Sequence, residues 1–171
     1  DIPAYMNGAS RGLLPQGDPH HFDRTRSDAF KNADVILIVG TPFDFRMGYG
    51  KRISKEATLV QIDQSYATVG KNRDISLGLA GSPGGILAAV TQAASGRIDK
   101  GARQQRQQWM AELREIEAAK LEKLMPMFIT DQSPIHPYRL AYEINEFLGE
   151  VKLIHLALAL FGLISSNSAI C

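Results

Sequence analysis

The apolar run Val35–Val39 constrains the fold of this chain more than any other stretch. It is short, rich in β-branched side chains and free of polar alternation. Such a run predicts a strand that is buried on both faces, as in parallel sheets covered by helices. Gly40 and Pro42 end the strand. Because ligands of open α/β sheets bind beyond the carboxyl ends of the strands, we expect any binding chemistry between Gly40 and Gly50.

Further runs of apolar and β-branched residues predict strands at Ile2–Met6, Thr58–Ile62 and Ile75–Ala80. A Gly or Asp follows each predicted strand within three residues. Helices are expected between and after these strands, at residues 23–32, 83–94, 100–123 and 137–148. This alternation predicts an α/β fold, a Rossmann-like doubly wound parallel sheet with helices on both faces.

Three local signals set the expected ends of these helices. Asp23 can cap the first helix, and Ser82 with Pro83 opens the second. Pro126 is expected to end or kink the long charged helix.

Composition excludes several classes of partner. The net charge of +1 and the 22% of charged residues give no electrostatic reason to expect nucleic acid or an anionic membrane as partner. The single cysteine, Cys171, allows no internal disulfide, which favours a reducing compartment, and we expect a cytoplasmic protein. The apolar run Val151–Ile164 is shorter than the roughly 20 residues that cross a bilayer.

Asp63 is the first candidate ligand-binding residue outside the Gly40–Gly50 segment. It comes directly after a predicted strand, where dinucleotide-binding folds carry an acidic residue for the ribose. A loop cap is an equally good interpretation of this residue. The G-x-G-x-x-G fingerprint is absent, since Gly81–Gly85 reads GSPGG, so NAD is only weakly indicated. Arg46, close to Asp44, can bind phosphate or can form a structural ion pair.

The motifs themselves resemble a known family. They are Asn7–Pro15 (NGASRGLLP), Pro19-His20, Gly40–Gly50 (GTPFDFRMGYG), Val60–Asp63 (VQID) and Val69–Asn72 (VGKN). In this spacing they resemble the middle domain of thiamine-diphosphate-dependent enzymes, in particular the acetolactate-synthase-like large subunits. The resemblance extends from about Ile2 to Leu148.

The resemblance implies a nucleotide site in this domain. FAD binds there in the synthases, and an adenine nucleotide such as ADP binds there in related CoA-dependent decarboxylases. By position, the implied cofactor-binding residues are Gly40, Thr41, Arg46, Asp63 and Gly81. Two residues depart from the family pattern: Pro42 stands where arginine is usual, and Ser82 where aspartate is usual. Both departures remove a polar contact that FAD would use, so three possibilities stay open: FAD, ADP or no bound nucleotide.

The resemblance also implies the domain organisation. Residues 1–98 correspond to the middle domain without its opening strand and helix, 99–133 to a linker helix, and 134–150 to the start of the pyrophosphate-binding domain. The apolar residues 151–171 depart from the family and suggest a change of reading frame. No catalytic or metal-binding residue is expected here, since the activating glutamate and the Gly-Asp-Gly…Asn motif for thiamine diphosphate and Mg²⁺ are absent.

The expected parent is a homo-oligomeric enzyme that decarboxylates a 2-oxo acid and transfers the product to a second carbonyl, with the missing domains as intramolecular partners. Two alternatives remain open. One is a 2-hydroxyacyl-CoA lyase or decarboxylase of the same family, and the other is a non-catalytic nucleotide-binding remnant.

Overall fold

The computed structural model describes residues 1–15, 17–97 and 99–149. They form two compact units, which are described separately. Within these residues, the first unit consists of Asp1–Ile2 with Thr25–Leu113, and the second consists of Pro3–Arg24 with residues 114–149. The apolar run Val151–Ile164 lies outside the described residues.

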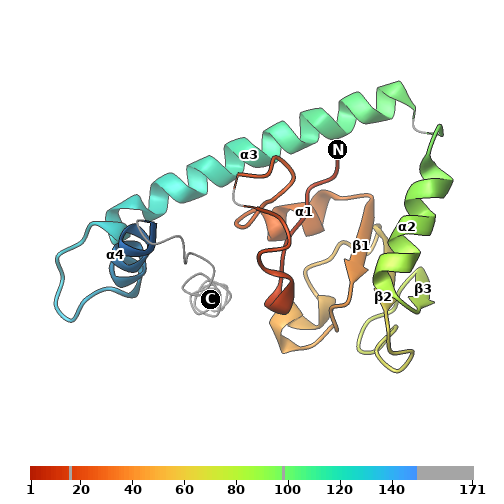
Figure 1. The fold of residues 1–171 in the computed structure, drawn as a ribbon, viewed down its shortest axis with the longest axis horizontal. Helices are drawn as coiled ribbons and strands as arrows, with labels where there is room; N and C mark the ends of the chain where they lie inside the picture. Colours follow the sequence, from red (N-terminus) through yellow and green to blue (C-terminus); the bar gives the residue numbers. More distant parts are fainter. Residues whose placement is uncertain (16, 98, 150–171) are drawn as a thin grey trace. The chain divides into compact units, whose positions relative to one another are not determined.

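A parallel sheet forms the centre of the first unit (Figure 1). Its strands are β1 (Val35–Val39), β2 (Thr58–Asp63) and β3 (Leu77–Ala80), in the order β1-β2-β3. In the register of the sheet, Ile38 lies beside Gln61, and Gln61 lies beside Gly78. The α/β class and the parallel sheet predicted from the sequence are therefore confirmed. The third strand is shorter than predicted and begins at Leu77 rather than Ile75.

Helices precede and follow this sheet along the chain. They are α1 (Arg26–Asn32), the 3-10 segment η2 (Phe45–Gly50), α2 (Pro83–Ala94) and α3 (Lys100–Phe128), whose first half belongs to this unit. Helix α2 begins as predicted: the Ser82 hydroxyl accepts a hydrogen bond from the Gly85 amide at 3.5 Å, and Pro83 occupies the first turn. It packs against β2.

Helix α1 begins later than predicted, at Arg26, with Thr25 rather than Asp23 at its N-cap. The backbone amide of Asp23 is instead bound by a side chain, the carboxylate of Glu117. Thr25 is fully buried, and its carbonyl accepts the first intrahelical hydrogen bond, from Ala29. Burial of the N-cap thus overrides the local preference for aspartate at the start of a helix.

One face of β1 is packed and the other is not. Ile36 and Ile38 are each 7% exposed and belong to a core with Phe43 and Leu59, against which residues of α1 pack. On the opposite face, Val35 is 58% exposed, and Leu37 is similarly open. The prediction that this strand is buried on both faces is therefore wrong for the described residues, because no described segment covers Val35 and Leu37.

The prediction of a strand at Ile2–Met6 is also wrong. Ala4 forms an isolated bridge with His21, using two backbone hydrogen bonds of 2.7 and 2.9 Å. Pro3 has no amide to extend a ladder on one side. On the other side the chain turns at Asn7 into the short 3-10 segment η1 (Gly8–Ser10).

The second unit is organised around a buried phenylalanine, Phe22, which is 1% exposed. The guanidinium carbon of Arg114, on the second half of α3, lies 3.6 Å from the centroid of its ring. Arg114 also donates to the carbonyl of Pro19 at 2.8 Å and pairs with Glu117 at 2.9 Å. One oxygen of Glu117 accepts two backbone amides, those of residues 23 and 24, at 2.6 and 2.7 Å. This polar network holds the irregular N-terminal segment on the helix.

Of the two predicted effects of Pro126, an end or a kink, the first does not occur, because the long helix runs on to Phe128. Only two residues of α3 follow the proline, so little of the helix lies beyond it. Helix α4 (Pro137–Gly149) follows, one residue longer than predicted.

Candidate functional site

The ends of the three strands meet at one edge of the sheet. The amide of Gly40 donates to the carbonyl of Ile62 at 2.8 Å, and the amide of Gly81 donates to the carbonyl of Asp63 at 2.9 Å. Three of the residues singled out from the sequence, Gly40, Asp63 and Gly81, are thereby brought side by side. Their arrangement is the carboxyl edge at which open parallel sheets bind ligands.

Gly40 leaves the space above this edge open. Its φ of +61° lies in the left-handed region, where glycine is favoured. A Cβ atom at this position would meet no atom of the described residues within 4 Å. A ligand can therefore approach the backbone closely. Thr41, which follows, points its hydroxyl back to the carbonyl of Val39 at 3.4 Å.

Asp63 has one carboxylate oxygen engaged and one available. Oδ1 accepts the amide of Ser65 at 2.8 Å and closes a tight turn after β2. Among the described residues no hydrogen bond to Oδ2 is recorded. The sequence left two interpretations of Asp63 open, a loop cap and a ribose ligand. The geometry allows both at once, because each would use a different carboxylate oxygen.

Arg46 lies in η2, beyond the strand ends. Its guanidinium is 3.5 Å from Oδ2 of Asp44, and Oδ1 of the same carboxylate accepts the Arg46 amide at 2.9 Å. The side chain is 61% exposed and lies over the ring of Phe45, 5.2 Å from its centroid. An ion pair this exposed contributes at most about 1 kcal/mol. Within the described part of the chain, no hydrogen bond or ion pair joins Arg46 to the strand-end residues, so the contacts at this edge bring together Gly40, Asp63 and Gly81 but not Arg46.

A residue that the sequence analysis missed connects the loops of this edge. Gln61, on β2, is fully buried, and its carboxamide bonds to Thr41 on one side and to Gly70 on the other. Two more side chains of the loop after β2 (the second loop) reach the segment between β1 and β2 (the first loop). Asn72 donates to the carbonyl of Phe43 at 3.1 Å, and Arg73 donates to the carbonyls of residues 53 and 54. A glutamine inside the otherwise apolar run Thr58–Ile62 was the available signal in the sequence.

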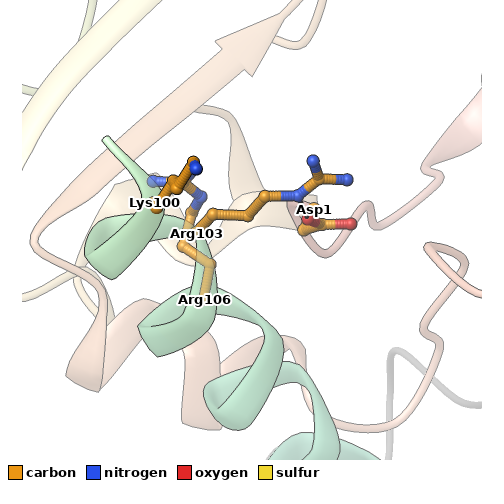
Figure 2. Close-up of a pocket in the computed structure, with 4 residues that line it drawn as sticks. All are labelled: Asp1, Lys100, Arg103 and Arg106. Carbon is orange, nitrogen blue, oxygen red and sulfur yellow. Dashed lines mark hydrogen bonds and ion pairs between the residues drawn. The ribbon is translucent and has the colours of Figure 1, made fainter. Parts of the chain in front are cut away.

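A separate hollow of about 430 Å³ lies away from this edge (Figure 2). It is lined by Lys100, Arg103 and Arg106 from the start of α3 and by Asp1, whose carboxylate is 2.8 Å from the Arg103 guanidinium. None of the residues predicted to bind a cofactor lines it. The strand edge remains the candidate site because it carries the predicted residues and the topology that favours ligands.

The described residues contain neither a cluster of metal ligands nor a helix suited to span a membrane. In residues 1–15, 17–97 and 99–149, no three His, Cys, Asp or Glu side chains gather where they could hold a metal ion. Within the same ranges, none of the helices combines the length and the apolar character that a membrane span requires.

Comparison with known proteins identifies the family. Residues 1–90 match the model of the thiamine pyrophosphate enzyme central domain. The chain is 33% identical over 161 residues to the acetolactate synthase large subunit IlvG of Mycobacterium tuberculosis, covering 94% of the chain and 28% of that protein. It is 28% identical over 159 residues to 2-hydroxyacyl-CoA lyase 2 of Danio rerio, covering 90% of the chain and 24% of that protein.

The chain thus spans about a quarter of the length of these relatives. The family match covers β1, β2, β3 and most of α2, the part of the chain in which the strand-end residues meet. The match and the parallel sheet agree with the resemblance found in the sequence motifs. The chain belongs to the thiamine-pyrophosphate enzymes and contains their central domain, in a form similar to acetolactate synthases.

Proposed function

We propose that this chain is the nucleotide-binding middle part of an acetolactate-synthase-like enzyme. The observation that supports this most strongly is the meeting of Gly40, Asp63 and Gly81 at the carboxyl edge of one parallel sheet. The ligand is an adenine nucleotide, FAD or ADP.

Each residue has a distinct part in binding. The left-handed backbone at Gly40 and the open space beside it allow the nucleotide to approach. Gly81 plays the same part at the neighbouring strand, and the Thr41 hydroxyl offers a polar contact. Arg46 presents a planar, permanently charged fork to the phosphates. The available oxygen of Asp63 accepts hydrogen bonds from ribose hydroxyls.

The whole protein is proposed to decarboxylate a 2-oxo acid and join the product to a second carbonyl compound. Thiamine diphosphate with Mg²⁺, the cofactor that the family implies, would supply the electron sink for this chemistry when bound. Residues 1–98 act as the middle domain, 99–133 as a linker and 134–150 as the start of the next domain. The protein is proposed to be a cytoplasmic homo-oligomer.

A lyase or decarboxylase acting on 2-hydroxyacyl-CoA is the second candidate function. The similarity to 2-hydroxyacyl-CoA lyase 2 over 90% of the chain favours it. The two candidates differ in substrate, and a turnover assay of the full-length protein with a 2-oxo acid and with a 2-hydroxyacyl-CoA separates them. A protein that binds nucleotide but turns over neither would be a non-catalytic module.

Calorimetric titration of FAD and ADP into the full-length protein tests the nucleotide site. Asp63→Ala and Arg46→Ala each remove one charged hydrogen bond, worth about 1.5–3 kcal/mol, so affinity should fall by about tenfold to a hundredfold. Arg97→Ala removes an exposed charge that follows the C-terminal end of α2, whereas α2 begins at the strand edge, and should leave affinity unchanged. If nucleotide binds and neither Asp63→Ala nor Arg46→Ala weakens it several-fold, the site lies elsewhere.

A further inference from the structure

Gln61 is one of the few buried polar side chains in the described residues, with no exposed surface. Its Nε2 donates to the carbonyl of Thr41 at 3.3 Å, and its Oε1 accepts the amide of Gly70 at 2.8 Å. Both the nitrogen and the oxygen of the carboxamide are therefore hydrogen-bonded. Burying a polar group is unfavourable unless it is hydrogen-bonded, so a glutamine here must serve both partners.

The two partners of Gln61 belong to different loops at the candidate site. Thr41 follows Gly40 at the end of β1, and Gly70 lies in the loop that follows β2 and Asp63. In space, the side chain bridges the segments that flank the open edge. The hydrogen bond from Asn72 to the carbonyl of Phe43 joins the same two loops at a second point.

Gly78 makes this bridge possible. It lies beside Gln61 in the register of the sheet, so both positions face the same side. A Cβ atom on Gly78 would lie 2.3 Å from Cγ1 of Val69, the residue before Gly70. The missing side chain thus allows the second loop to lie low enough on the sheet for the Gly70 amide to reach Gln61.

We propose that Gln61 is the positioning residue of the nucleotide site: it fixes the distance between the loops after β1 and β2 without contacting the nucleotide. This inference rests on the proposed function, since the ligand is the nucleotide proposed above. The carboxamide suits the task because it holds a donor group and an acceptor group in one fixed plane. A methionine fills the same space with neither, and an ionised carboxylate would face the Thr41 carbonyl with a second acceptor.

The first test uses Gln61→Met in the full-length protein, with Leu59→Ala as the matched control. Leu59 is 2% exposed on the same face of β2, and its side chain makes no hydrogen bond, so its truncation lowers stability without removing the bridge. Gln61→Met should raise hydrogen exchange in segments 40–46 and 68–73 by about tenfold or more over the control, since the Gly70 amide loses its acceptor. FAD or ADP affinity should fall by about tenfold relative to the control.

The second test uses Gln61→Glu at two pH values. A protonated carboxyl group offers one donor and one acceptor, as the carboxamide does. Burial raises the pKa of the introduced carboxyl group, and the carboxylate of Asp63, on the same face of β2, raises it further. Two cations of the second loop follow Gly70: the Lys71 side chain is exposed, and Arg73 is engaged with the carbonyls of residues 53 and 54. At about pH 5 the affinity of this variant for FAD or ADP should therefore equal that of the unmodified protein. At about pH 8 it should be about tenfold lower than that of the unmodified protein.

The outcomes separate the inference from the proposed function. Loop exchange that is unchanged in Gln61→Met overturns the inference, whether or not nucleotide binds. The inference is also overturned if the nucleotide affinity of Gln61→Met falls no further than that of Leu59→Ala. It is overturned as well if the affinity of Gln61→Glu, relative to the unmodified protein, does not change with pH. If the unmodified protein binds neither FAD nor ADP, the proposed function fails, and raised exchange in both loops would still support the bridge.

Discussion

Replacing Gly78 by alanine tests whether the second loop lies as closely on the sheet as the structure shows. The added Cβ would lie 2.3 Å from Cγ1 of Val69 and 3.0 Å from Cδ1 of Ile75. Ordinary carbon–carbon contacts lie at about 3.5–4.0 Å, so the loop must move by about an ångström. Val69 cannot swing away easily, because a β-branched side chain is stiff at χ1.

The cost of this overpacking is about 1–3 kcal/mol of the free energy of unfolding. The assay is urea unfolding of the full-length protein, read as a lower midpoint with an unchanged slope. Gly84→Ala is the matched control, since Gly84 is exposed on α2 and a Cβ there meets no described atom within 4 Å. That variant should be neutral, or more stable by about 0.4–1 kcal/mol, because alanine reduces the freedom of the unfolded chain.

A double variant provides the internal check. Truncating Val69 to alanine removes Cγ1 and leaves its Cβ 3.8 Å from the new methyl group, an ordinary contact. The combined loss in Gly78→Ala with Val69→Ala should therefore be smaller than the sum of the single losses by about 1 kcal/mol or more. A neutral Gly78→Ala, or strictly additive losses, would refute the proposed packing of the loop on β3.

Two predictions concern the second unit. Glu117→Ala should lower the free energy of unfolding by about 1.5–3 kcal/mol, because one charged oxygen accepts two backbone amides; a loss below about 0.5 kcal/mol in urea unfolding would contradict this. The backbone amide of His20, and then its side chain, hold the pKa of Asp18 below the usual value of 3.8. Asp18 therefore stabilises the fold above pH 3.8, and this contribution is lost as pH falls through its lowered pKa. NMR titration of the Asp18 carboxyl group should show this lowered pKa, and a pKa at or above 3.8 would count against the turn.

The sequence by itself determined the fold class and the place of the candidate site. Short apolar runs alternate with stretches of helical periodicity in this sequence, and this alternation specifies a parallel sheet covered by helices. Both patterns can be read from neighbouring residues alone. The start of α2 at Ser82 and Pro83 was predictable for the same reason, since an N-cap depends on neighbouring residues only. Gly40 and Asp63 were found because topology places strand ends at one edge.

Only the tertiary structure decided which residues connect these elements. Val35 and Leu37 are exposed because burial depends on what packs above a strand, and a run of apolar residues cannot report that. Thr25, which is fully buried, caps α1 in place of Asp23. The backbone amide of Asp23 instead donates to the carboxylate of Glu117, which lies 94 residues further along the chain. The glutamine in an apolar run marked Gln61 in the sequence, but its partners could not be predicted for the same physical reason. Its two hydrogen bonds reach loops 20 residues before it and 9 residues after it, and only the folded sheet brings them together.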